Sequence, residues 1–90
     1  MYSKASKASS FLQVIFLTVY CMEEDLEKVR DIVGYRTAHG ILWPPHVSVP
    51  RPGTFMYQVT QTYRKEKVDN MYGVIPTLVK DGYRMHIHYA

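Results

Sequence analysis

One stretch of this chain limits its possible folds more than any other, the apolar run Phe11–Met22. Its side chains are mainly aliphatic and aromatic, and they are apolar at both sets of alternating positions. A strand with two apolar faces normally lies in the centre of a sheet and is covered on both sides. The run is also shorter than the roughly 20 residues that a membrane-spanning helix needs. We therefore expect a central β-strand and no membrane span.

The residues before this run, Met1–Ser10, resemble the charged region of a signal peptide, because Lys4 and Lys7 precede an apolar stretch. However, the small-x-small cleavage site that a signal peptide needs does not follow the apolar run. We therefore expect residues 1–10 to form a flexible, basic and Ser-rich tail, and residues 11–90 to form a single domain.

The composition is typical of one small globular domain. With 90 residues, 47% of them apolar and 21% charged, the chain is neither disordered nor collagen-like, and it is too short for a dinucleotide-binding domain. Its single cysteine, Cys21, cannot form an internal disulfide, which favours a reducing compartment. We therefore expect a cytoplasmic protein in which Cys21 is a buried and inert thiol.

The middle of the chain predicts a helix followed by a proline-rich segment. Glu23–Gly40 has acidic residues in its first turn, basic residues in its last turn and a glycine at its end. Gly34 lies inside this expected helix and weakens it. Ile41–Gly53 holds four of the five prolines. Proline cannot donate to a β-ladder, so this segment is at most an edge strand, and whether it pairs stays open.

The last third predicts a strand, a helix and a strand. Thr54–Glu66 alternates between apolar and polar residues, as a half-buried strand does. Val68–Gly82 has helical spacing, although Pro76 either kinks this helix or begins a shorter one. Tyr83–Ala90 alternates again. The resulting order β-α-β-β-α-β predicts an α+β, ferredoxin-like two-layer sandwich, with two helices on one face of the sheet.

The open face of such a sheet is the main candidate for function. Our leading hypothesis is a small non-enzymatic interaction module, a subunit or accessory factor with no cofactor and no catalytic residue. The second apolar face of the first strand needs a protein partner or a second copy of the chain, and the 8 tyrosines suit an interface. The candidate partner-binding residues are Phe16, Tyr20, Trp43, Gln58, Arg84, His86 and His88.

Nucleic-acid binding is the alternative hypothesis, since the net charge is +3, although the cations are scattered along the chain. Its candidate residues are Lys4, Lys7, Arg64, Lys65, Lys67 and Arg84. Stacking on bases requires exposed rings, and the alternation turns Phe55, Tyr57 and Tyr63 away from the polar face. Whether these three rings face the core or the open side stays open, and Phe16 and Tyr20 are the other candidates for stacking.

A histidine-based metal site or enzyme is the third hypothesis. His86 and His88 are two residues apart in an expected strand, so both imidazoles lie on one face. With His39 or His46 they would complete a zinc or copper site. The sequence near the pair offers no cysteine or carboxylate. We therefore expect no metal, and we keep His46, His86 and His88 as weak candidates.

Overall fold

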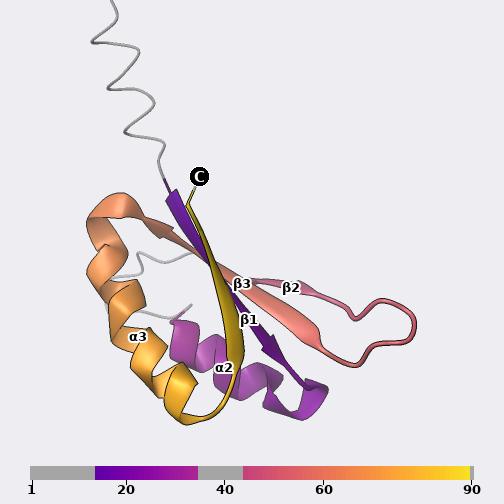
Figure 1. Cartoon of the computed structure of the whole chain (residues 1–90). Helices are drawn as coiled ribbons and strands as arrows, with labels where there is room; N and C mark the ends of the chain where they lie inside the picture. Colours follow the sequence, from indigo (N-terminus) through magenta and orange to yellow (C-terminus); the bar gives the residue numbers. More distant parts are fainter. Residues whose placement is uncertain (1–13, 35–43, 90) are drawn as a thin grey trace, which may run out of the picture.

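The computed structural model describes residues 14–34 and 44–89, which form an α+β structure with one open, antiparallel sheet and two α-helices (Figure 1). The strands are β1 (Val14–Cys21), β2 (His46–Ser48), β3 (Tyr57–Arg64) and β4 (Arg84–Tyr89). The helices are α2 (Leu26–Val33) and α3 (Val68–Lys80), and each follows a 3-10 turn, η1 (Glu23–Asp25) or η2 (Lys65–Lys67).

The strand order is β2-β3-β1-β4, and every neighbouring pair is antiparallel. β1 pairs with β3 on one side and with β4 on the other, which confirms the predicted central strand. The proline-rich segment does pair, but only over His46–Ser48 and only at the edge of the sheet. Its prolines flank this short strand, where their missing N–H groups cost no ladder hydrogen bond.

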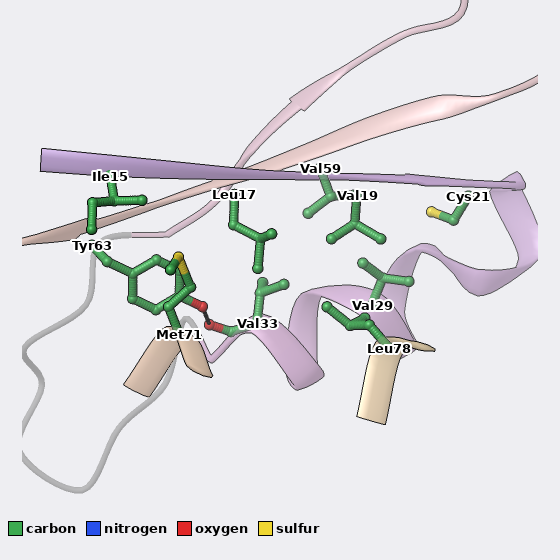
Figure 2. Packing of buried hydrophobic residues seen from close by; sticks show 10 residues of the cluster. All are labelled: Ile15, Leu17, Val19, Cys21, Val29, Val33, Val59, Tyr63, Met71 and Leu78. Carbon is green, nitrogen blue, oxygen red and sulfur yellow. Dashed lines mark hydrogen bonds between the residues drawn. The ribbon is translucent and has the colours of Figure 1, made fainter. Parts of the chain in front are cut away.

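Both helices pack against the same face of the sheet, and the core lies between them and β1 (Figure 2). Alternate residues of β1 are buried there, because side chains of a strand point to its two faces in turn. The buried apolar residues are Ile15, Leu17, Val19, Cys21, Val29, Val33, Val59, Tyr63, Met71 and Leu78. The other face of β1 is only half-buried, so the expectation that both faces are covered is wrong for the described residues.

One hydrogen bond joins the sheet to the end of α2. The Tyr63 hydroxyl donates to the backbone carbonyl of Val33 at 2.8 Å, within the core (Figure 2). Burial raises the pKa of Tyr63 well above its ordinary value, because the phenolate would lose its hydration there. The neutral hydroxyl is therefore the form that holds the end of α2 against β3.

The helix predicted over Glu23–Gly40 is shorter than expected. α2 ends at Val33, and Gly34 takes the left-handed conformation, with φ of 81°. The Gly34 N–H donates to the carbonyls of Arg30 and Asp31, so this glycine caps the helix and does not lie inside it. The rest of the predicted helix, with the proposed stop at Gly40, lies outside the described residues.

α3 is a single helix that runs through Pro76. Proline removes one hydrogen bond to the preceding turn, but Pro76 is exposed, so water can hydrate the carbonyl left free. Gly82 follows the helix with φ of 83°, and the Tyr83 N–H donates to the Leu78 carbonyl at 3.1 Å. This geometry is a Schellman-type ending, and it confirms the predicted stop at Gly82.

Candidate binding face of the sheet

The face of the sheet that lies opposite α2 and α3 is the candidate site, and we call it the open face (Figure 1). It is defined by the side chains that alternate with the buried ones and by their partners across the strands. They are Val14, Phe16, Thr18, Tyr20, His46, Ser48, Gln58, Thr60, Thr62, Arg64, Arg84, His86 and His88.

Pairing of the strands arranges these side chains in rows across the sheet. One row joins Arg84, Tyr20, Gln58 and Ser48; the next joins His86, Thr18, Thr60 and His46; a third joins His88, Phe16 and Thr62. The hydroxyls of Thr18 and Thr60 are hydrogen-bonded at 2.9 Å, which ties the two central strands together on this face. Residues more than sixty positions apart in the chain therefore form one surface.

Aromatic rings are stacked along one side of the open face. The ring centroids of Phe16 and His88 lie 6.1 Å apart, and the planes of the rings differ by 29°. The rings of His86 and His88 are 6.5 Å apart and differ by 25°. Phe16 and Tyr20 are half-buried on the central strand, so neighbouring groups hold each side chain while part of it stays exposed. This arrangement offers flat, oriented apolar surfaces to a ligand.

Charge is divided between the two layers of the structure. All 8 aspartates and glutamates of the chain lie in η1, α2, η2, α3 or the turn after α3. The open face has no carboxylate among its described residues, whereas it carries Arg64, Arg84 and the three histidines. An anion on this face would meet cations and neutral groups, and the negative charges would stay in the helical layer.

Tyr20 and Met56 border two shallow hollows at one end of the open face. The first, of about 380 Å³, is also lined by Arg84, Met85 and His86. The second, of about 530 Å³, lies toward β2 and the loop after it, and its lining includes Ser48 and Gln58. Both volumes fall at the lower end of the range for small-ligand sites. The open face therefore has two hollows that adjoin Tyr20.

The structure brings together most of the predicted partner-binding residues. Six of them lie on the open face, namely Phe16, Tyr20, Gln58, Arg84, His86 and His88. Trp43 lies outside the described residues.

The predicted nucleic-acid residues are more dispersed. Arg64 and Arg84 lie on the open face, whereas Lys65 and Lys67 lie in η2, beyond the end of β3. Lys4 and Lys7 lie outside the described residues. Of these six residues, the open face therefore carries the two arginines, and Lys65 and Lys67 lie beyond its edge.

The predicted alternation of side chains between the two faces of β3 is present in the structure, and it places one further residue, Gln61, in the core. Tyr57 and Tyr63 turn toward the helices, while Phe55 precedes the strand and is 75% exposed. Sequence reasoning missed Gln61, which the same alternation places in the core, fully buried. Its Oε1 accepts a hydrogen bond from the N–H of Thr62 at 2.8 Å. Strict period-two counting was the signal that could have found it.

The histidines do not form a metal cluster within the described residues. No group of three or more His, Cys, Asp or Glu side chains is placed there to hold an ion. His46 lies on β2, three strand spacings or about 14 Å from His86 on β4. The other proposed ligand, His39, lies outside the described residues. His86 and His88 thus form a pair to which the described chain adds no third ligand.

Cys21 is buried at the end of β1. Burial raises the pKa of its thiol, with a smaller contribution from Asp25. The reactive thiolate is therefore disfavoured, in agreement with the interpretation of Cys21 as a core residue.

Known proteins offer no guide to this face. No family model, curated protein or solved structure matches the chain. Within residues 14–34 and 44–89, no helix is both long and apolar enough to cross a membrane. The open face must therefore be interpreted from its own chemistry.

Proposed function

We propose that this chain is a small non-enzymatic binding module that takes single-stranded nucleic acid on its open sheet face. The observation that carries the proposal is the division of charge described above. A polyanion is attracted to a surface with cations and no carboxylate, and electrostatic attraction to phosphates supplies most sequence-independent affinity for nucleic acid. This proposal places the alternative hypothesis, nucleic acid, ahead of a protein partner.

The aromatic side chains favour a single strand over a duplex. Bases of a single strand expose their flat faces, and they stack on aromatic side chains of binding proteins. Phe16 and Tyr20 lie four residues apart on β1, which separates them by about 13 Å along the strand. That spacing leaves room for more than one stacked base, with Arg84 beside Tyr20 for contact with a phosphate.

We also propose that the fold is ferredoxin-like. The element order β-α-β-β-α-β and the strand order β2-β3-β1-β4 support this assignment. Such a topology places both helices on one face of the sheet, which leaves the other face for a ligand. The free, buried Cys21 supports a reducing compartment such as the cytoplasm.

A protein partner or a second copy on the same face is the second candidate. Val14, Phe16 and Tyr20 favour it, because together they offer apolar contact area on the central strand. Face-to-face pairing of two copies would, however, bring Arg84 of each copy into one interface, and the described residues of the open face include no carboxylate. Light scattering that gives a dimer, which Phe16→Ala converts to a monomer, would favour this candidate.

The proposal predicts that Phe16→Ala weakens binding to a rhodamine-labelled oligouridylate of about 12 nucleotides, measured by fluorescence anisotropy. Loss of one stacking platform should cost about 1–3 kcal/mol of binding free energy. Phe55→Ala is the matched control, because Phe55 is exposed but does not belong to the open face. Its affinity should equal that of the wild type.

Two results would contradict the proposal. One is equal weakening by Phe16→Ala and Phe55→Ala, and the other is no binding by the wild-type chain at low salt. Circular dichroism on both variants checks that the sheet still forms, so that a loss of binding is assigned to the ring and not to unfolding.

A further inference from the structure

His86 and His88 form the most regular group of titratable side chains on the open face. Both lie on β4, both are exposed, and their rings are nearly parallel at 6.5 Å. The ring of Phe16, on the neighbouring strand, lies 6.1 Å from that of His88. The pair is therefore adjacent to one of the two rings on which we place the bases.

The groups around the pair do not include a described carboxylate. On the same face, β4 adds Arg84, β1 adds Phe16, Thr18 and Tyr20, and the more distant strands add Arg64 and His46. The helices α2 and α3, which carry three of the 8 acidic residues, pack on the opposite face, and the other five acidic residues lie in η1, η2 or the turn after α3. A positive charge on either imidazole therefore has no described anionic partner, and the second charge is opposed by the first.

We infer that His86 and His88 form a proton-dependent site for backbone phosphates of the bound strand, at the β4 edge of the open face. This inference rests on the proposed function. Histidine changes its charge between about pH 8 and pH 5, and a protonated imidazole donates from both ring nitrogens. A phosphate beside the two rings supplies the negative charge that the protein does not. Binding of the strand and uptake of protons then favour each other.

Proton uptake should make binding stronger and more dependent on salt as the pH falls. We expect the affinity for the rhodamine-labelled oligouridylate to rise about fivefold or more between about pH 8 and about pH 6. The slope of log affinity against log salt should steepen by about 0.7 for each imidazole that gains a phosphate contact. Salt series at both pH values, on the full chain, measure the two quantities.

The double substitution His86→Gln with His88→Gln removes both titratable groups and keeps polar side chains. Its affinity should rise much less than that of the wild type between about pH 8 and about pH 6. His46→Gln is the matched control, since His46 lies on the same face but at the other edge, on β2. This control should keep most of the rise.

The outcomes separate this inference from the function on which it rests. Binding that is equally strong and equally salt-dependent at both pH values overturns the histidine site and leaves nucleic-acid binding intact. A rise that survives in the double variant, or that only His46→Gln removes, overturns the placement at β4. Absence of binding at both pH values overturns the function and this inference together.

Discussion

Tyr63 shows how much depends on one side chain in a core of this size. Its ring fills space between β3 and the helices, and its hydroxyl holds the last carbonyl of α2. The same burial that makes the hydrogen bond effective also makes ionisation costly. A buried carbonyl without its donor carries the full desolvation penalty. A substitution that removes the hydroxyl and keeps the ring therefore separates the contribution of the hydrogen bond from that of ring packing.

Tyr63→Phe should lower the free energy of unfolding by about 1–3 kcal/mol, because the Val33 carbonyl loses its buried donor. Urea unfolding at about pH 7, followed by circular dichroism, measures the change. A variant as stable as the wild type would contradict the role given to this hydroxyl.

The same pair of proteins tests a pH dependence. The pKa of Tyr63 is raised in the folded chain above its ordinary value of 10.0. The folded state therefore keeps a proton that the unfolded state releases, and the stability from this group is complete below pH 10.0 and is lost as the pH rises beyond it. The difference between the wild type and Tyr63→Phe should shrink between about pH 9 and about pH 11. A constant difference would contradict the assignment.

At the scale of elements, the two helices differ in where their glycine and proline residues lie. Gly34 ends α2 in the left-handed region, whereas α3 accepts Gly73 and Pro76 inside its length. An ion pair of 3.2 Å between Lys28 and Asp81 joins the start of α2 to the end of α3. Since the Lys28 side chain is 54% exposed and the Asp81 side chain is 29% exposed, water screens this pair and it contributes little, so packing on the sheet holds the helices.

Two identical substitutions should therefore have opposite effects. Gly34→Ala forces a side chain into the left-handed region and should destabilise the fold by about 1–2 kcal/mol. Gly73→Ala should stabilise it by about 0.5–1 kcal/mol, because an added Cβ meets nothing within 4 Å and alanine favours the helix. Thermal unfolding of both variants gives the comparison. A Gly34→Ala variant at least as stable as the wild type would refute the cap assigned to Gly34.

At the scale of the whole molecule, the structure is a sheet whose two faces meet different environments. One face is dry and packed by the helices, and the other carries cations, hydroxyls and rings. All carboxylate side chains lie in the helices, in the 3-10 turns before them or in the turn after α3. A net charge of +3 is unremarkable as a sum, but its spatial division gives the open face a positive character.

This division predicts different effects for two cations. Arg84→Gln removes a charge from the open face and should weaken binding of the oligouridylate and lower the salt slope by about 0.7. Lys80→Gln removes an equal charge from the end of α3 and should change both quantities much less. The salt series used for the histidine variants measures both. Equal effects would indicate attraction by the net charge and no defined binding face.

Much of the architecture was predictable because hydrophobic period and glycine position are local signals. The two apolar faces of β1 predicted its central place, and alternation in β3 predicted that Tyr57 and Gln58 lie on opposite faces, whereas the structure decided that Tyr57 faces the core. The end of α2 was not predictable in this way, since Gly34 is compatible with a helix interior and with a cap. Only the backbone conformation, φ of 81°, distinguishes the two.

The sequence by itself determined which side chains share a face within each strand, because that follows from a period of two along the chain. It placed His86 beside His88, and Phe16 on the same side as Tyr20. Only the tertiary structure decided that these pairs adjoin one another, with Gln58 and Arg84 on either side of Tyr20. The physical reason is register, which depends on how strands distant in the chain align over a shared core.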